Sequence, residues 1–248
     1  MHEHTQRNLD YYSRLTAGRA DYWRYMPAPR FRAHVIANIL QKEHPGSVVD
    51  LGCGDGMLLA EIREAVADAE LAGIDLSPGQ IEQNRKTMPD VEWFVGNLES
   101  DELALPRGFE ALASSEVIEH LTHPANFLRT AYRLASDGAL LVLSTQSGPI
   151  GETELQVGHL RHFTKEEMTA LLEDAGWQPV RVWNTGFPFQ DLSKWAANLS
   201  PNTMMEHFGV KPYGRMQKIV AAVLRLLFLL NSRSRGAQLF AVARKRTT

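Results

Sequence analysis

The sequence predicts an α/β fold in one domain, with a mostly parallel sheet that helices cover on both faces. Short runs rich in Val, Ile and Leu alternate with segments whose apolar residues recur every three or four positions, which is typical of βα units. The chain has 248 residues, enough for one sizeable core and too few for two large domains. Its 44% hydrophobic and 22% charged residues indicate a globular protein rather than a disordered one.

Residues 1–45 are expected to form a helical arm ahead of the sheet. The range 7–26 lacks strand alternation, and Pro27 and Pro29 separate it from a helix expected over 31–43. Its aromatic residues would either close over a ligand as a lid or pack on the core. Its arginines would either meet an anionic substrate or remain solvated. The aromatic residues are Tyr11, Tyr12, Tyr22, Trp23 and Tyr25, and the arginines are Arg14, Arg19 and Arg24.

Residues 46–184 are expected to form the core of alternating strands and helices. We expect strands over 47–51, 71–75, 91–95, 109–115, 139–144 and 177–183. We expect helices over 57–67, 78–88, 124–134 and 164–175. Ser77 and Pro78 are typical of an N-cap with Pro at the first helical position, and Thr164 with Glu167 forms a capping box. Sheets of this kind bind ligands beyond the carboxyl ends of their strands, so candidate site residues are sought there.

Residues 185–236 are expected to form an insertion, and 237–248 a last strand (238–243) with a basic tail. A hairpin connection needs only a few residues, so an insertion this long is expected to have a role. It contains a strongly apolar helix over 216–230. Three interpretations remain open for this helix: a packed element or homodimer interface, a substrate lid, or weak contact with a membrane surface.

The net charge of −3 excludes a basic surface over the whole chain, so no nucleic-acid partner is expected. That sum conceals a split. Nine of the 26 Lys and Arg, and none of the 29 Asp and Glu, lie from Lys211 onward. The first 210 residues therefore carry a charge of −12, and the rest carry +9.

Other features of the sequence favour a cytoplasmic protein. A single cysteine excludes a disulfide scaffold and fits a reducing compartment. The polar range Met1–Asp10 does not have the apolar region of a signal peptide. The longest apolar stretch, 219–230, is interrupted by Arg225 and is too short to span a bilayer, so no transmembrane segment is expected.

A glycine-rich turn is the strongest local signal. Gly52, Gly54 and Gly56 follow an apolar strand and precede a helix, so the backbone can turn sharply and offer N–H groups to a ligand. The spacing is not that of the dinucleotide fingerprint, and the Lys-Ser/Thr of a phosphate loop is missing. Asp50 and Asp55 would repel a pyrophosphate and favour a ligand with a cationic amino group. The alternative is a tight turn without a ligand.

Polar residues also end the next two expected strands. Asp75 lies 19 positions after Gly56, where an acidic side chain can accept hydrogen bonds from ribose hydroxyls. Asn97 follows the third strand, and its amide suits the edge of an adenine. Together these residues describe a site for a nucleoside that carries an amino-acid tail.

With these motifs in this order, residues 47–183 resemble the class I S-adenosylmethionine-dependent methyltransferases. The resemblance implies a Rossmann-like seven-stranded sheet with an antiparallel last strand between the fifth and sixth. It also implies S-adenosylmethionine as cofactor. By resemblance, the methionine part is held by Asp50, Gly52, Cys53, Gly54 and Gly56, the ribose by Asp75, and the adenine by Leu76, Asn97 and Leu98, with Ser115 as a further contact. The family often has Asp where this chain has Asn97, but Asn can still accept from the adenine amine.

The segment after the fourth strand carries candidate catalytic residues. If a helix begins near Glu116, then Glu116, Glu119 and His120 share one face. They could hold a divalent cation such as Mg²⁺, which would lower the pKa of an acceptor hydroxyl. The spacing resembles the Glu-x-x-Glu-His motif of metal-dependent small-RNA 2′-O-methyltransferases and ubiquinone-pathway O-methyltransferases. A later His completes that set, and His159 or His162 could do so here.

Two other roles remain open for the same residues. His120 or His159 could act as a base without a metal, or the cluster could be structural. The function expected from the whole sequence is methyl transfer to a small-molecule acceptor, with O-methylation of a sugar or secondary metabolite leading. One alternative is RNA 2′-O-methylation with a metal site. Another is a catalytically silent S-adenosylmethionine-binding subunit that supports a partner.

Overall fold

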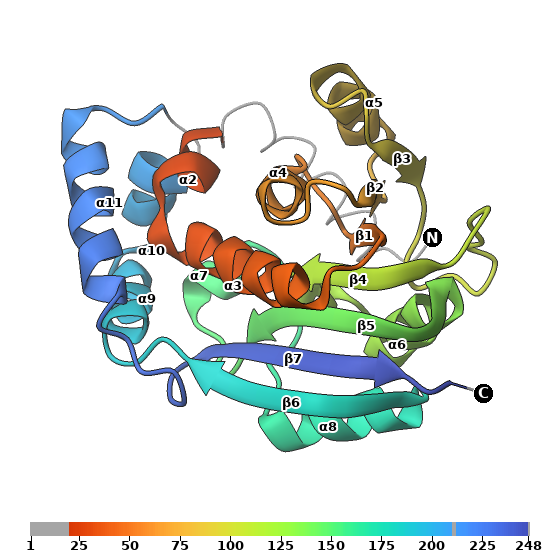
Figure 1. The fold of residues 1–248 in the computed structure, drawn as a ribbon. Coiled ribbons are helices and arrows are strands. Elements are labelled where there is room, and N and C mark those ends of the chain that lie inside the picture. The colour runs from red at the N-terminus through yellow and green to blue at the C-terminus, as the bar shows by residue number, and fades with distance from the viewer. Residues whose placement is uncertain (1–19, 210–211, 248) are drawn as a thin grey trace.

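A single seven-stranded sheet organises the computed structural model, which describes residues 20–209 and 212–247 (Figure 1). The strand order is β3-β2-β1-β4-β5-β7-β6. The strands are β1 (Ser47–Leu51), β2 (Glu70–Asp75), β3 (Glu92–Val95), β4 (Phe109–Ser115), β5 (Ala135–Gln146), β6 (Trp177–Thr185) and β7 (Gln238–Lys245). Strands β1 to β5 pair in parallel, whereas β7 runs antiparallel to both of its neighbours. This confirms the predicted fold class and the place of the antiparallel strand.

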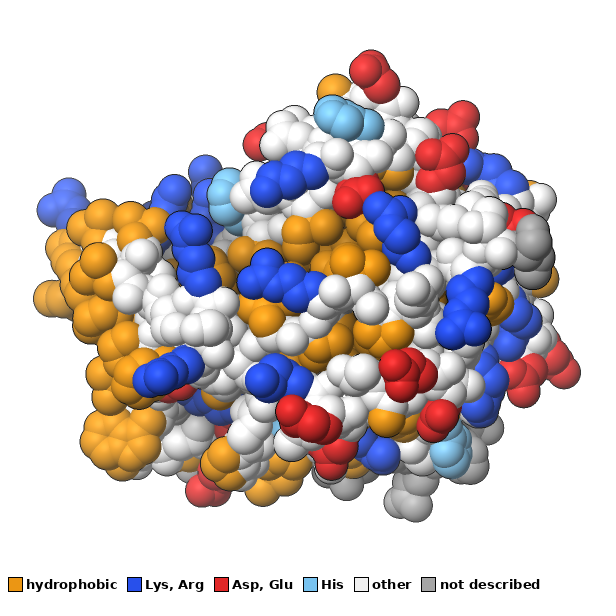
Figure 2. Space-filling view, turned by 60° about the horizontal axis from the view of Figure 1, so that its bottom comes forward, with side chains coloured by type: hydrophobic (Ala, Val, Ile, Leu, Met, Phe, Trp, Pro, Cys, Tyr) orange, Lys and Arg blue, Asp and Glu red, His pale blue; other side chains and the backbone are white. Residues whose placement is uncertain are grey.

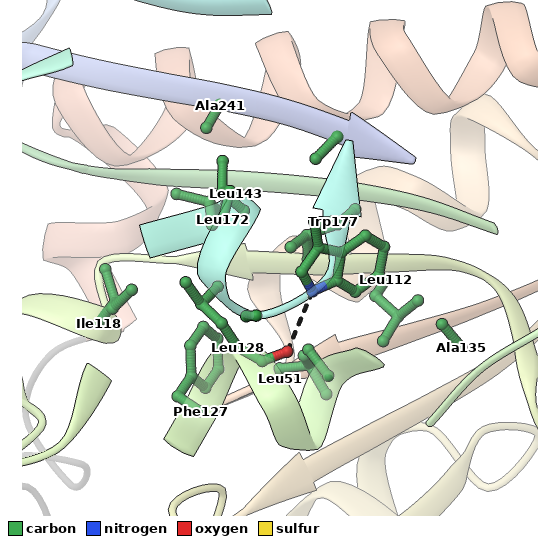
Figure 3. Packing of buried hydrophobic residues seen from close by; sticks show 14 of the residues in the cluster. Leu51, Leu112, Ile118, Phe127, Leu128, Ala135, Leu143, Leu172, Trp177 and Ala241 are labelled. Atoms are coloured by element: carbon green, nitrogen blue, oxygen red, sulfur yellow. Dashed lines mark hydrogen bonds between the residues drawn. The ribbon is translucent and has the colours of Figure 1, made fainter. Parts of the chain in front are cut away.

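Helices cover both faces of the sheet, as Figure 1 shows. On one face lie α3 (Pro27–Glu43), α4 (Met57–Ala65) and α5 (Pro78–Thr87), and on the other lie α6 (Pro124–Leu134) and α8 (Lys165–Asp174). The apolar residues of each helix recur at helical spacing and face the sheet, which gives two core layers. In the second layer the indole Nε1 of Trp177 donates to the carbonyl of Leu128 at 3.0 Å, which ties β6 to α6 (Figure 3).

Three local expectations differ from the structure. Helix α3 begins at Pro27 rather than at residue 31, because proline is tolerated in the first turn of a helix. Strand β5 begins at Ala135 rather than at residue 139, and it includes Asp137 and Gly138. The helix expected near Glu116 is wrong. Only a 3₁₀ turn, η1 (Ile118–His120), forms there, because Glu116 takes a left-handed φ of 57° that no α-helix includes.

The insertion folds into helices at the end of the sheet toward which β4 and β5 run (Figure 1). Its elements are α9 (Phe189–Leu199), α10 (Pro201–Met204), the π-helical turn η2 (Met205–Gly209) and α11 (Arg215–Phe228). Helix α11 contacts α9, α3 and the arm helix α2 (Ala20–Tyr25), and the Tyr213 N–H donates to Asp21 at 2.6 Å. The short helix α7 (Glu152–Gln156) also contacts α9.

Part of the predicted arm lies outside the described residues, namely Tyr11, Tyr12, Arg14 and Arg19. Within 20–209 and 212–247, no helix combines the length and the apolar character needed to cross a bilayer.

Candidate functional site

A cavity of about 780 Å³ lies at the carboxyl ends of the central strands and continues beneath the insertion. At one end it is lined by the glycine turn and the residues that follow β2 and β3. At the other end it is lined by side chains of η1, α7, α9 and α11. Among the predicted cofactor residues, the cavity wall contains Asp50, Gly52, Cys53, Gly54, Asp75, Leu76, Asn97, Leu98 and Ser115.

The glycine turn exposes backbone to this cavity. A Cβ on Gly54 would have no atom within 4 Å, so a ligand can approach the backbone closely there, and its φ of +48° is left-handed. A Cβ on Gly52 would lie 2.5 Å from Val117 Cγ2. Gly56 instead packs against Met88 and Trp93 and is not part of the cavity wall. The structure therefore gives Gly56 a packing role and Gly54 the open position.

The carboxylate of Asp75 links two backbone segments of the site. Its Oδ2 accepts from the Gly54 N–H at 3.0 Å, and its Oδ1 accepts from the Ser77 N–H at 2.9 Å. Burial raises the pKa of Asp75, and these backbone hydrogen bonds partly oppose that rise. Each oxygen keeps a second acceptor position, which suits a pair of hydroxyl groups. Asn97 accepts from the Glu99 N–H at 3.0 Å, which leaves its NH₂ group as a donor.

Asp50 is the residue whose surroundings point most directly to a cationic ligand. Its carboxylate is 1% exposed, and Oδ1 accepts no hydrogen bond from the described residues. Burial raises its pKa well above the usual range, and the charges of Asp75 and Asp55 raise it further. An ammonium group beside Asp50 would stabilise the ionised carboxylate and so lower this pKa. The donors and acceptors at this end of the cavity thus fit the amino group and ribose of S-adenosylmethionine.

The raised pKa of Asp50 predicts pH-dependent cofactor affinity. The protonated carboxyl cannot attract an ammonium, so affinity should be constant above this pKa and should fall below it. One linked proton limits the fall to about tenfold per pH unit. Calorimetric titration with S-adenosylhomocysteine between neutral and acidic pH measures this. Asp50→Asn should bind more weakly at neutral pH and lose most of the dependence. An unchanged pH profile in Asp50→Asn would contradict the assignment.

At the other end of the cavity, His120 and His159 line the wall and converge with Glu119, which is fully buried behind them, and the candidate ligand atoms of the three lie within 4.8 Å of one another. Glu119 and His120 belong to the turn η1, and His159 lies in the chain after α7. The Leu160 N–H donates to the Glu119 carbonyl at 2.9 Å, which holds these two segments together. Glu119 Oε2 accepts from Thr145 Oγ1 at 2.8 Å, whereas Oε1 accepts no hydrogen bond from the described residues. Burial raises the pKa of Glu119 well above its usual range, and the charge of Glu116 adds to this.

Glu116 lies outside this group. It accepts hydrogen bonds from Gln146 and, at 2.9 Å, from Gln238, and it forms an ion pair with Arg32 at 3.7 Å. It lines the cavity while it joins the ends of β5 and β7 to α3. The shared helical face that was expected to bring Glu116 beside His120 does not form.

A chain of hydrogen bonds fixes the protonation of His159. His162 Nδ1 lies 3.0 Å from the Gly148 carbonyl, which can only accept, so the proton is on Nδ1. Burial lowers the pKa of His162, so its Nε2 is an acceptor, and His159 Nδ1 donates to it at 2.9 Å. Burial and then the neighbouring His120 lower the pKa of His159 to about 2. His159 is therefore neutral, with a lone pair on Nε2.

Three cationic residues in the cavity wall, Arg30, Arg32 and Lys194, were not among the predicted site residues. Arg32 is only 6% exposed, and it lies four and eight positions before the buried Ile36 and Leu40 of α3. An Arg on the apolar side of a helix is the sequence signal that could have identified it as a cavity residue. Lys194 of α9 lies 3.2 Å from Glu154 Oε1 and 3.3 Å from Gln146 Oε1. Burial raises the pKa of Glu154, but Lys194 and hydrogen bonds outweigh this, so its pKa is lowered.

This sheet order, the glycine turn and the acidic residue at the end of β2 define a class I S-adenosylmethionine-dependent methyltransferase. The chain belongs to the family described as a methyltransferase domain, whose model matches residues 22–182. The cofactor class predicted from the sequence is thus confirmed at the level of the family.

Relatives support the same family. A probable S-adenosylmethionine-dependent methyltransferase from Mycolicibacterium smegmatis is 30% identical over 168 residues, which are 64% of this chain and 60% of that protein. A ubiquinone biosynthesis O-methyltransferase from Xanthomonas campestris is 32% identical over 108 residues, 41% of this chain and 44% of that protein. The matched region thus spans at most 60% of these relatives.

A solved structure shares the fold. The N-methyltransferase NodS from Bradyrhizobium japonicum, in complex with S-adenosylhomocysteine, has a TM-score of 0.60 at 14% identity and matches 96% of this chain and 98% of that one. At this identity the likeness concerns the fold alone.

Proposed function

We propose that this chain transfers a methyl group from S-adenosylmethionine to a hydroxyl oxygen of a small molecule, a sugar or another secondary metabolite. The observation that carries the proposal is one continuous cavity, with the Asp50 and Asp75 carboxylates at one end and His159 at the other. The name of the Xanthomonas relative, an O-methyltransferase, supports an oxygen acceptor.

Residues at the two ends of the cavity have different proposed roles. When bound, S-adenosylmethionine supplies an electrophilic methyl group on a cationic sulfur. Asp50 favours the cationic amino group, and Asp75 accepts from the ribose hydroxyls. The Nε2 lone pair of His159 accepts the proton of the acceptor hydroxyl, while its Nδ1–H points toward His162. Because burial and His120 hold the pKa of His159 low, its Nδ1 proton passes to His162 Nε2 as His159 Nε2 gains the acceptor proton, and the positive charge rests on the less buried His162.

The acceptor end combines polar and apolar surfaces. Arg32 and Lys194 supply cationic groups, and Val220, Leu224 and Phe208 supply apolar ones. An acceptor with both a polar ring or sugar and an apolar portion fits such a wall. The insertion thus contributes to the proposed acceptor site, which favours a role in substrate binding over a purely structural one.

A metal-assisted reaction is the second candidate, and the convergence of Glu119, His120 and His159 favours it. Glu119 Oε1 and His159 Nε2 have lone pairs that a divalent cation could use. Two imidazoles and one carboxylate suit Zn²⁺, Fe²⁺ or Mn²⁺ better than Mg²⁺, which prefers oxygen ligands. In this form the acceptor could include the 2′-hydroxyl of RNA, the alternative that the Glu-x-x-Glu-His spacing suggested.

Chelation separates these candidates. If His159 is a metal-free base, dialysis against EDTA should leave kcat within about twofold of the untreated enzyme, because proton transfer then needs only the imidazole. Loss of turnover that Zn²⁺ or Mn²⁺ restores would contradict the metal-free base. The control is enzyme dialysed against buffer without EDTA and assayed in parallel with the EDTA-dialysed enzyme, both without added metal.

Incubation with methyl-labelled S-adenosylmethionine and a panel of phenols, sugars and short RNAs, followed by mass spectrometry, tests the proposal. A labelled O-methyl product from a small molecule is expected. Transfer to nitrogen or carbon, or to RNA alone, would contradict it. Tight binding of S-adenosylhomocysteine without transfer to any acceptor would favour the catalytically silent subunit.

A further inference from the structure

The outer side of the insertion exposes a continuous apolar surface. On α11 and the residues after it, the exposed large apolar side chains are Met216, Ile219, Val223, Leu226, Leu229 and Leu230, each between 50% and 77% exposed. Leu192, Trp195 and Leu199 of α9 are exposed by 54% to 62%. Figure 2 shows hydrophobic side chains gathered along the left flank, where Figure 1 places α9 and α11. We call these nine side chains the outer apolar face.

Helix α11 is apolar on two opposite sides. Ala221 and Phe228 are buried, and Val220 and Leu224 line the cavity. The apolar residues exposed on the opposite side recur at intervals of three and four from Met216 to Leu229, and Leu230 lies four positions after Leu226. A helix that only walled a cavity would have a polar outer side. The outer side of α11 therefore needs an apolar partner of its own.

Basic residues border this face. Lys218 and Arg225 lie seven positions apart on one edge of α11, and Arg215 stands at its first turn. Arg233 and Arg235 follow the helix and are exposed. In the described range 212–247 the chain has no Asp or Glu, so α11 and the residues after it add no acidic side chain to this face. Figure 2 shows Lys and Arg side chains beside the hydrophobic flank.

We propose that the outer apolar face docks on an anionic lipid bilayer, with α11 in the plane of the interface. An apolar stripe with a basic border matches the acyl boundary and the negative headgroups of such a surface. A second copy of this chain is the less favoured occupant, because it would bring another Arg- and Lys-rich border against the first. Charge complementarity thus selects the lipid surface.

Docking there would define the acceptor more narrowly, and this part rests on the proposed function. The inner side of α11 walls the acceptor end of the cavity while its outer side meets the bilayer. An acceptor whose hydroxyl-bearing head enters the cavity could keep an apolar chain in the membrane. The substrate class is then a lipid-anchored or long-chain hydroxyl compound rather than a freely soluble sugar.

Co-sedimentation with vesicles tests the docking without turnover. Wild-type protein should bind vesicles of equal parts phosphatidylglycerol and phosphatidylcholine at least tenfold more tightly than pure phosphatidylcholine vesicles, and added salt should weaken the binding. Leu226→Glu should lower this binding at least tenfold, and Arg225→Glu should reduce the preference for anionic vesicles. Both side chains are exposed, so the melting temperature and the affinity for S-adenosylhomocysteine should be unchanged.

Val180→Glu is the matched control, because Val180 is 60% exposed on β6 and lies outside the outer apolar face. It should bind vesicles like the wild type. Equal binding to both vesicle types, no binding to either, or equal losses in Val180→Glu and Leu226→Glu would overturn the proposal. So would a dimer in sedimentation velocity that Leu226→Glu converts to a monomer.

The acceptor class is tested by methyl transfer to a long-chain phenol in anionic vesicles and to its short-chain soluble analogue. Leu226→Glu should lower transfer to the long-chain phenol at least fivefold and leave transfer to the analogue unchanged. Equal effects on both would overturn the lipid-anchored class. Vesicle binding with no transfer to either compound would contradict the proposed function and leave the docking supported.

Discussion

Replacing His159 by Ala is expected to lower kcat by about 10²–10⁴-fold, the range that a positioned general base contributes. The imidazole is neutral, and its Nδ1–H is committed to His162, so Nε2 is the atom that can take the acceptor proton. The affinity for S-adenosylhomocysteine should remain within about twofold, because His159 lies at the acceptor end of the cavity and not beside Asp50. Steady-state kinetics and calorimetry on the same preparation measure both quantities.

Three further variants test whether the loss of kcat comes from the His159 imidazole itself. His34→Ala removes an exposed histidine of α3 and should leave kcat unchanged. His162→Phe removes the group that accepts the His159 Nδ1–H and should reduce kcat less than His159→Ala does. If His120→Ala abolished turnover while His159→Ala reduced it less than threefold, the base would be His120 and the assignment would be wrong.

The proposed cofactor end of the cavity could be predicted from the sequence because its residues lie at the ends of neighbouring strands. The carboxyl ends of parallel strands meet at one edge of a sheet, so Asp50, Asp75 and Asn97 had to lie close together once the βα alternation was recognised. The glycine spacing marked the turn between them. Only the separate role of Gly56, which packs against Met88 and Trp93, required the structure.

The reaction end could be predicted only in part. The sequence predicts that Glu119, His120 and His159 lie together, but the helix from Glu116 that this prediction assumes does not form. No residue pattern marks a Glu with a φ of 57°. The start of β5 at Ala135 was not predictable, because Asp-Gly is typical of a turn and the strand continues through residues 137 and 138 by a shift in register between Phe109 and Ala111 of β4. Lys194 reaches the cavity only because long-range contacts, such as the Ser232 N–H donating to the Phe187 carbonyl, fold the insertion back over the sheet.

Replacing Asp75 by Ala is expected to weaken binding of S-adenosylhomocysteine by about 10–150-fold. Hydrogen bonds to a charged group contribute about 1.5–3 kcal/mol, and each 1.4 kcal/mol corresponds to about tenfold in affinity. The variant removes the proposed acceptor for the ribose hydroxyls and also releases the N–H groups of Gly54 and Ser77.

Two ligands separate the role of Asp75 from that of Asp50. 5′-Methylthioadenosine contains the ribose but no amino-acid group, so Asp75→Ala should weaken both ligands by the same factor. Asp50→Asn should weaken S-adenosylhomocysteine and spare 5′-methylthioadenosine, since the buried carboxylate of Asp50 is assigned to the ammonium. Glu173→Ala, an exposed acidic residue of α8, controls for net charge and should bind both ligands normally. If Asp75→Ala spared 5′-methylthioadenosine, Asp75 would act through the turn at Gly54 and not through the ribose.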